Sequence, residues 1–277
     1  MKRIVTIQDI SCVGKCSITV ALPIISAMGV ECGIVPTAVL STHTMFSGFT
    51  FKDLTEEIIP IAEHWEKENF KFDAIYTGYL GSFEQIRIIS EFFDRFKTDD
   101  NIIFIDPVMA DNGKLYPGFD EAFALEMAKL CSKADVIVPN LTEACFMTNS
   151  KYNPDGDEAY IKDILKKLAE LGAKKVVLTG MSFEKGKTGF VGMDSESGSI
   201  FTYSHDIVNA IYHGTGDVFS SATVGALMRG RPLSDALRIA ADYTVECIKK
   251  TIKNGKLNWY GVDFEEALPM LVNKINK

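Results

Sequence analysis

The chain has 277 residues and a formal net charge of −8, from 29 basic and 37 acidic side chains, and 47% of its residues are hydrophobic. This composition is typical of a globular protein, and the acidic balance argues against nucleic-acid binding that relies on the charge of the whole molecule. The longest apolar run, residues 20–30, contains Pro23 and is far shorter than the roughly 18 residues of a membrane helix, so we expect a cytoplasmic protein without membrane partners.

Short β-rich segments alternate with amphipathic segments over most of the chain, which is the pattern of a parallel sheet with crossover helices. In chain order, the predicted strands are residues 3–8, 31–36, 72–77, 101–106, 134–139 and 175–180. The predicted helices are residues 14–28, 53–69, 82–97, 119–132, 157–171, 215–230, 233–253 and 263–275. Glycine-punctuated runs near 187–203 predict antiparallel strands at one edge of the sheet. No shift of composition marks a second domain, so we predict one α/β domain over residues 1–277.

Polar side chains follow nearly every predicted strand. In an open parallel sheet the ligand binds beyond the carboxyl ends of the strands, so these positions are the first candidates for a site. They include Asp9, Ser11, His43, Thr44, Tyr79, Asp106, Asn140, Glu143, Thr179 and Gly180.

The most specific local signal is the run His-Gly-Thr-Gly-Asp, residues 213–217, which leads into an apolar helix. Glycines on both sides of Thr215 let backbone N–H groups converge on an anion, and a helix N-terminus favours negative charge. Asp217 is badly placed to bind that anion but well placed to take a proton from a nucleophile that attacks it. Capping of the helix by Thr215 or Asp217 explains the same residues, and the local sequence leaves both interpretations open.

Three acidic residues, Asp106, Asp111 and Glu143, follow two neighbouring predicted strands. Oxygen ligands at such strand ends fit magnesium held largely through water. Helix capping is the other interpretation, because Asn140 is a good N-cap and Glu143 stands where its capping-box partner would be. The two interpretations are compatible.

Motifs of several other chemistries are absent from the sequence. It contains neither a P-loop nor a G-x-G-x-x-G after the first strand, and Ser204-His205 forms no nucleophile elbow. The six cysteines are scattered without a C-x-x-C pair, so we predict reduced, mostly buried thiols. His43 and His213 flank the expected site, and packing explains them better than catalysis.

The order of these segments resembles the ribokinase-like superfamily. The matching segments are a polar cluster after the first strand, Thr-His-Thr at 42–44, GYLG at 78–81, DPVMAD at 106–111, PNLTE at 139–143, VLTG at 177–180 and GTGD at 214–217. Within the superfamily the sequence is most similar to the pyridoxal kinases, the vitamin B6 kinases, with the hydroxymethylpyrimidine kinases as near relatives. The resemblance covers residues 3–230.

The resemblance implies a three-layer α/β/α fold and an ATP-dependent kinase that requires Mg²⁺ and forms a homodimer, and it leaves assistance by K⁺ open. Asp217 corresponds to the catalytic base for the 5′-hydroxyl, and the amides of Gly214, Thr215 and Gly216 correspond to the anion hole for the γ-phosphoryl group. The implied ATP and magnesium neighbourhood consists of Asp106, Asn140, Glu143, Thr179 and Gly180, with Asp111 as a further cation-linked position. The implied contacts with the pyridine ring are Thr44 and Tyr79, accompanied by His43.

One departure concerns the substrate. Many pyridoxal kinases have Gln-Ser after the first strand, whereas this chain has Gln8, Asp9, Ile10 and Ser11, which is closer to the D-x-S pattern of hydroxymethylpyrimidine kinases. Those enzymes commonly have cysteine where this chain has Asp217. We therefore predict phosphorylation of pyridoxal, pyridoxine and pyridoxamine, with Asp9 accepting a hydrogen bond from an amine or a ring N–H. The alternatives are a hydroxymethylpyrimidine kinase, a non-catalytic nucleotide- or B6-binding regulator, and a sugar or nucleoside kinase.

Overall fold

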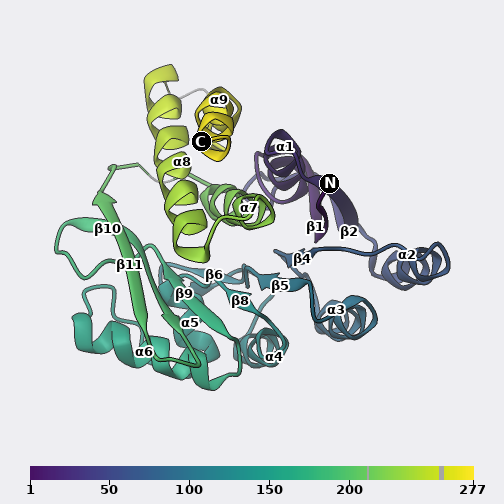
Figure 1. Ribbon diagram of the computed structural model, residues 1–277, viewed down its shortest axis with the longest axis horizontal. Helices are drawn as coiled ribbons and strands as arrows, with labels where there is room; N and C mark the ends of the chain where they lie inside the picture. Colours follow the sequence, from purple (N-terminus) through teal and green to yellow (C-terminus); the bar gives the residue numbers. More distant parts are fainter. Residues whose placement is uncertain (211, 256–258) are drawn as a thin grey trace. The chain divides into compact units, whose positions relative to one another are not determined.

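The computed structural model describes residues 1–210, 212–255 and 259–277 (Figure 1). The chain forms two compact units. The first unit comprises Met1–Gly78 and Val208–Lys277, and the second comprises Tyr79–Ile207. A single domain over the whole chain stays a prediction. In the part of the chain that is described, none of the helices combines the length and apolarity needed to cross a membrane.

The first unit is built on a sheet whose inner strands are parallel. Strand β1 (Arg3–Val13) pairs in parallel with β2 (Glu31–Thr42) on one side and with β4 (Ala74–Thr77) on the other, and the short β3 (Phe51–Asp53) is antiparallel to β2. Residues 4–9 of β1 are all buried, as expected for a strand with covered faces.

Five helices complete the first unit: α1 (Ile18–Ala27), α2 (Thr55–Lys67), α7 (Thr215–Met228), α8 (Leu233–Asn254) and α9 (Phe264–Ile275). Helix α7 packs against α1 and α8, and α9 packs against α8 (Figure 1). Residues 218–226 of α7 are all buried, and the helix approaches α1 so closely that a Cβ at Gly225 would lie 2.4 Å from the sulfur of Met28. Small residues such as Gly225 therefore let α1 and α8 pack closely against α7.

The second unit has three parallel strands followed by an antiparallel edge. Strands β5 (Ile102–Ile105), β8 (Val136–Ile137) and β9 (Lys175–Thr179) are parallel, and β10 (Lys187–Asp194) and β11 (Ile200–Asp206) continue the sheet in antiparallel pairing. The hairpin of β6 (Ala110–Asp111) and β7 (Lys114–Leu115) is separate. The helices are α3 (Phe83–Phe96), α4 (Glu121–Cys131), α5 (Leu141–Met147) and α6 (Glu158–Glu170). The predictions of a mostly parallel α/β fold and of antiparallel edge strands are confirmed.

Several predicted boundaries are wrong near the first strands. Strand β1 continues to Val13, so Asp9 and Ser11 lie inside the strand and not after it. A register shift between Gln8 and Ile10 absorbs one extra residue and lets pairing with β2 resume. The first helix begins at Ile18 and not at residue 14, because residues 14–17 form a loop with positive φ at Lys15 and Ser17.

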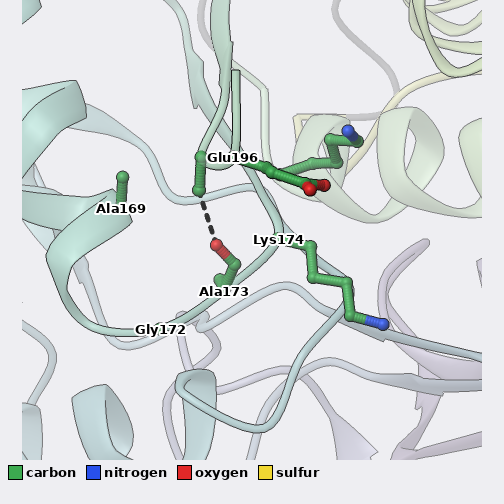
Figure 2. A pocket seen from close by; sticks show the side chains of 7 residues that line it. Ala169, Gly172, Ala173, Lys174 and Glu196 are labelled. Carbon is green, nitrogen blue, oxygen red and sulfur yellow. Dashed lines mark hydrogen bonds between the residues drawn. The ribbon is translucent and has the colours of Figure 1, made fainter. Parts of the chain in front are cut away.

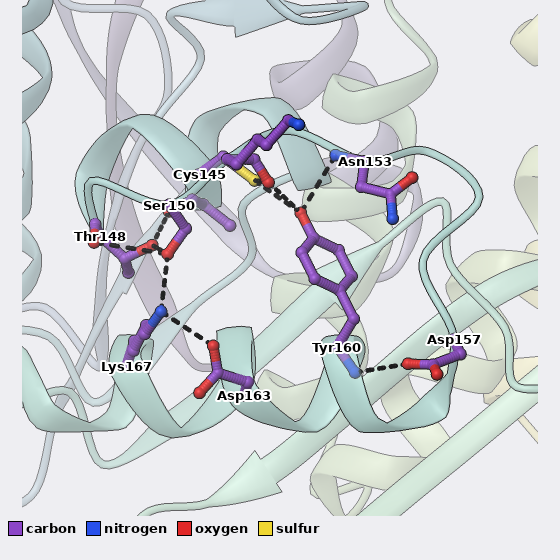
Figure 3. A network of polar contacts seen from close by, with 10 residues as sticks. Cys145, Thr148, Ser150, Asn153, Asp157, Tyr160, Asp163 and Lys167 are labelled. Atoms are coloured by element: carbon purple, nitrogen blue, oxygen red, sulfur yellow. Dashed lines mark hydrogen bonds and ion pairs between the residues drawn. The ribbon is translucent and has the colours of Figure 1, made fainter.

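Tyr160 on α6 holds the connection that follows α5 (Figure 3). Its hydroxyl donates to the Lys151 carbonyl at 2.7 Å, accepts from the Asn153 N–H at 3.2 Å and lies 3.2 Å from the Cys145 sulfur. Burial raises the pKa of the Cys145 thiol. All six cysteines are free thiols. Three of them are buried, as predicted, whereas Cys16 and Cys32 are half-buried and Cys12 is exposed.

Asp135, directly before β8, ties three elements of the second unit together. One carboxylate oxygen accepts from Lys97 Nζ at 2.6 Å and from the Ile103 N–H at 2.8 Å, and the other accepts from Lys174 Nζ at 2.7 Å. Burial acts to raise the pKa of this carboxyl, but the bonds from Lys174, Lys97 and Ile103 outweigh it and hold the pKa below its ordinary 3.8.

Replacing Asp135 with asparagine should lower the free energy of unfolding by about 1–3 kcal/mol at pH 7, because two charge-assisted bonds are lost from a nearly buried site. Since a carboxyl with a lowered pKa stabilises the fold above its unfolded pKa, the difference from wild type should shrink as the pH falls below 3.8. Urea unfolding at several pH values measures this, with the exposed Asp100→Asn as control. A difference that is the same at pH 7 and pH 3 would contradict the assignment.

Candidate active site

Asp9 is a buried carboxylate whose oxygens are both bound by serine hydroxyls. It is 4% exposed and accepts from Ser11 Oγ at 2.9 Å and from Ser17 Oγ at 2.6 Å. Burial raises the pKa of Asp9, while the hydrogen bonds from Ser17 and Ser11 act in the opposite direction. A buried acidic group costs free energy unless it is paired, and here the two serine hydroxyls supply that pairing.

The loop before α1 has an unusual backbone that serves this carboxylate. Ser17 occupies the N-cap position of α1 with φ 52° and ψ −135°, yet its side chain makes no capping hydrogen bond and points to Asp9 instead. Lys15 also has a positive φ of 51°, which is costly for a residue with a side chain. Its Nζ donates to Asp263 at 3.1 Å and to Glu265 at 2.7 Å, which fixes the loop.

Gly214 begins α7 in a conformation that suits only glycine. Its φ is +75°, and a Cβ at this position would lie 2.0 Å from the Lys15 carbonyl oxygen. The structure gives the N-cap position to Gly214, and Thr215 directs its hydroxyl to the Tyr212 carbonyl at 3.4 Å. Capping of α7 by Thr215 is therefore not formed, and the glycine start that the anion interpretation requires is present.

Asp217 lies half-buried in the first turn of α7. Burial, followed by the charges of Asp217 and Asp9, raises the pKa of the Cys16 thiol to about 12. Cys16 thus stays a protonated thiol at neutral pH, as its packing role predicts, and both carboxylates lie near it.

His43 is the centre of an aromatic group that the sequence interpretation missed. Its Nδ1 accepts from the Met45 N–H at 3.2 Å, and its Nε2 lies 3.0 Å from the Tyr260 carbonyl, to which a neutral ring donates. Burial lowers the pKa of His43. Its ring centroid lies 4.9 Å from that of Phe46 and 6.2 Å from that of Trp259. Both ring nitrogens are used by the protein, so His43 is unsuited to proton transfer, which agrees with the packing role predicted for it.

Two further residues of the first unit, Thr44 and His213, lie close to His43. Thr44 is exposed in the turn that begins at His43, and the ring centroid of His213 lies 5.1 Å from that of His43. Asp9, Ser11, His43, Thr44 and residues 214–217 thus all belong to the first unit. Tyr79 belongs to the second unit, where its ring centroid lies 5.6 Å from that of Phe119.

The predicted ATP residues gather around the start of α5 in the second unit. Asn140 accepts from the Glu143 N–H at 3.0 Å and Glu143 accepts from the Asn140 N–H at 2.8 Å, so the predicted capping box is confirmed. Glu143 also accepts from the Met109 N–H at 3.1 Å. Burial, with the charge of Asp106 as the second cause, raises the pKa of Glu143 above its ordinary value. Asp106 and Glu143 are therefore close neighbours in a buried setting.

Thr179 and Gly180 lie beside these residues. Thr179 forms a parallel bridge with Asn140, and its N–H donates to the Pro139 carbonyl at 2.9 Å. Gly180 has φ +71°, and its N–H donates to the Gly189 carbonyl at 2.9 Å. The carboxyl ends of β5, β8 and β9 thus bring five of the predicted ATP residues together.

The residues predicted to hold magnesium do not form a direct ligand cluster. Across residues 1–210, 212–255 and 259–277, no three His, Cys, Asp or Glu side chains are grouped as metal ligands. Asp111 is exposed and accepts from the N–H of Asn112 at 2.8 Å and from its side-chain amide at 3.0 Å. Because backbone amides already occupy much of the Glu143 carboxylate, this donor set fits an ion held mainly through water and phosphate.

A surface pocket of the second unit lies away from these strand ends (Figure 2). Its lining includes Gly172, Lys174, Lys175 and Glu196, around the amino end of β9. Ser195 Oγ donates to the Ala173 carbonyl at 2.6 Å across it. The predicted phosphate contact Thr179 is at the opposite end of the same strand, so this pocket has no part in the candidate site.

Comparison with known proteins identifies the family. The family described as phosphomethylpyrimidine kinase matches residues 17–260. A crystal structure of a protein from Bacteroides thetaiotaomicron assigned to the phosphomethylpyrimidine kinases, in a form with pyridoxal, is 39% identical with a TM-score of 0.92 and covers 98% of this chain and 95% of that one. The pyridoxal kinase of Lactobacillus plantarum is 29% identical with a TM-score of 0.90, over 99% and 97% of the two chains.

A curated relative represents the other substrate class. The hydroxymethylpyrimidine/phosphomethylpyrimidine kinase of Haemophilus influenzae is 27% identical over 92% of this chain and 94% of its own length. The predicted resemblance to both kinase groups is confirmed. The chain belongs to the phosphomethylpyrimidine kinase family and is a kinase related to both the pyridoxal kinases and the hydroxymethylpyrimidine kinases.

Proposed function

We propose that this kinase transfers the γ-phosphoryl group of ATP to the 5′-hydroxyl of vitamin B6 vitamers, in pyridoxal 5′-phosphate salvage. The observation that carries the proposal is the loop before α1, which binds Asp9 through Ser17 Oγ at 2.6 Å and lies against Gly214, where α7 begins with Asp217 in its first turn. One carboxylate can bind a polar group of the heterocycle while the other faces the hydroxymethyl group. Homodimer formation and a cytoplasmic location stay predictions from the sequence.

In this mechanism Asp217 accepts the proton of the substrate hydroxyl as its oxygen bonds to the γ-phosphorus. The bond between that phosphorus and the β,γ-bridging oxygen breaks, and ADP leaves with its electron pair. The amides of Gly214, Thr215 and Gly216 stabilise charge on the transferred group at the helix N-terminus. When bound, Mg²⁺ would neutralise charge on the β- and γ-phosphates, and Asp106 and Glu143 would hold it through water.

A panel of single-substrate assays tests the proposal. Pyridoxal, pyridoxine, pyridoxamine and hydroxymethylpyrimidine are each incubated with ATP and Mg²⁺, and ADP formation gives kcat/KM. We expect the vitamers to rank above hydroxymethylpyrimidine. The reverse ranking would favour the alternative, a hydroxymethylpyrimidine kinase, which the D-x-S pattern at Asp9 and Ser11 supports. If no ADP forms with any of the four compounds, the result would favour a non-catalytic regulator.

Replacing Asp9 with asparagine should separate binding from stability. The amide keeps one acceptor for Ser17 Oγ and gains a donor toward Ser11 Oγ, while the charge that binds an N–H group is lost. We expect KM for pyridoxine to rise roughly ten-fold, because a hydrogen bond to a charged group is worth about 1.5–3 kcal/mol.

The melting temperature of the Asp9→Asn variant should be equal to or above that of wild type. Burial raises the pKa of Asp9, so the ionised carboxylate opposes folding at neutral pH and a neutral amide does not. Differential scanning fluorimetry measures this alongside the kinetics. A fall of several degrees with an unchanged KM would assign Asp9 to structure and not to the substrate.

A further inference from the structure

The segment 259–265 is the part of the first unit that no sequence motif marked and that contacts both loops of the candidate site. The carbonyl of Tyr260 lies 3.0 Å from His43 Nε2, which connects it to the loop after β2. Asp263 and Glu265 accept from Lys15 Nζ, which connects it to the loop after β1. The segment is therefore fixed to the two loops that carry Thr44 and Ser17.

The contact with the loop after β1 is also sterically close. A Cβ at Gly261 would lie 2.4 Å from the Lys15 Cβ and 3.2 Å from the Gly14 carbonyl oxygen. Lys15 in turn presents its carbonyl to Gly214, the first residue of the predicted anion hole. Lys15 thus contacts segment 259–265 through its ion pairs with Asp263 and Glu265, and the start of α7 through its carbonyl oxygen.

Trp259 places a flat apolar ring at this junction. Its ring centroid lies 4.6 Å from that of Phe46 and 6.2 Å from that of His43, and yet the residue is 51% exposed. One side of the indole is covered by the aromatic group while a large part stays open to solvent. An aromatic ring that is packed on one side and open on the other can stack on a planar ligand.

The chemistry around this aromatic group defines what it would bind. His43 packs against the loop after β1, because a Cβ at Gly14 would lie 2.9 Å from its Cδ2, and Ser17 of that loop binds Asp9 at 2.6 Å. The ring of His213, directly before Gly214, lies 5.1 Å from that of His43. The aromatic group therefore contacts both the loop that binds Asp9 and the residue directly before the glycine start of α7. Since the nitrogens of His43 are both used by the protein, the group offers ring faces and not hydrogen bonds.

We propose that Trp259, supported by Phe46 and His43, is a specificity-determining residue that stacks on the planar ring of the acceptor. The acceptor class is a flat heteroaromatic alcohol with an N–H or amine for Asp9, and sugars, which lack such a ring, are disfavoured. Lys15 is the positioning residue that holds segment 259–265 in place through Asp263 and Glu265. This inference rests on the proposed function for its choice of ligand, but not for its test.

Binding of pyridoxine without ATP, measured by calorimetry, tests the stacking directly. Trp259→Ala should raise Kd roughly ten-fold, the loss expected for an aromatic contact with its buried apolar area, and Trp259→Phe should restore most of the affinity. Trp65→Phe is the matched control, because Trp65 on α2 packs with Phe70 and Phe72 and should leave Kd unchanged.

A purely structural role of Trp259 or Lys15 would change KM for ATP as well as Kd for pyridoxine. We expect Lys15→Met to raise Kd for pyridoxine in the same direction as Trp259→Ala, while KM for ATP stays within two-fold in both variants. An unchanged Kd for pyridoxine in Trp259→Ala, or an equal loss in Trp259→Phe, would overturn the proposal. If wild type binds pyridoxine, Trp259→Ala weakens that binding, and no heterocycle is phosphorylated, the proposed function is wrong but the stacking role of Trp259 is supported.

Discussion

Replacing Asp217 with asparagine should lower kcat for pyridoxal by at least about a hundred-fold, because a positioned general base contributes roughly 10²–10⁴ to the rate. The amide keeps the size of the carboxylate but cannot take the proton of the substrate hydroxyl. KM for ATP and the melting temperature should stay close to the wild-type values, since the glycine start of α7 is unchanged. Initial-rate kinetics with both substrates varied measure the effect.

The matched control for this variant is Asp235→Asn. Asp235 is likewise an acidic residue in the first turn of a long helix, α8, where it pairs with Arg238 at 3.2 Å. A loss of helix-dipole stabilisation would affect the two variants alike, whereas the loss of a base affects only Asp217→Asn. Turnover within a few-fold of wild type in Asp217→Asn would contradict its assignment as the base.

Replacing Gly214 with alanine should lower the free energy of unfolding by about 2–4 kcal/mol and also lower kcat. A φ of +75° alone costs an alanine about 1 kcal/mol, and the added Cβ would lie 2.0 Å from the Lys15 carbonyl oxygen. Backbone must therefore move, either in the loop before α1 or at the start of α7. Urea unfolding and steady-state kinetics measure the two consequences.

Gly186→Ala isolates the contribution of the close contact. Gly186 has nearly the same φ, +79°, but a Cβ added there would have no atom within 4 Å. It should lose only the conformational part of the stability and retain kcat. Equal losses of stability in the two variants would show that the approach of Lys15 to Gly214 has no energetic role.

The sequence predicts the contacts among the candidate residues better in the second unit than in the first. Asn140 and Glu143 were recognisable because a capping box depends on residues three apart, and local sequence is sufficient for it. Asp106, Thr179 and Gly180 follow directly after short strands or end them, where the strand-end rule applies without adjustment. Their grouping follows from parallel pairing alone.

The contacts of the first unit are harder to predict because they join residues that are far apart in the sequence. Nothing local shows that β1 continues past Asp9, opposite an extra residue in β2, or that the Ser17 side chain binds that carboxylate and does not cap α1. Trp259 and Tyr260 reach His43 from more than 200 residues away, and an isolated aromatic pair gives no periodic signal. The local signal for a functional role of this segment is the pair Trp259-Tyr260 followed by Gly261, and it matches no motif.

The most direct test of the proposed activity is a competition for limiting ATP. Pyridoxal, pyridoxine, pyridoxamine and hydroxymethylpyrimidine are mixed in equal amounts with enzyme, Mg²⁺ and less ATP than acceptor, and the phosphorylated products are quantified by mass spectrometry. We predict that 5′-phosphates of the vitamers dominate and that Asp217→Asn yields almost none. Hydroxymethylpyrimidine phosphate as the main product, or ATP left intact in the presence of all four acceptors, would contradict this assignment.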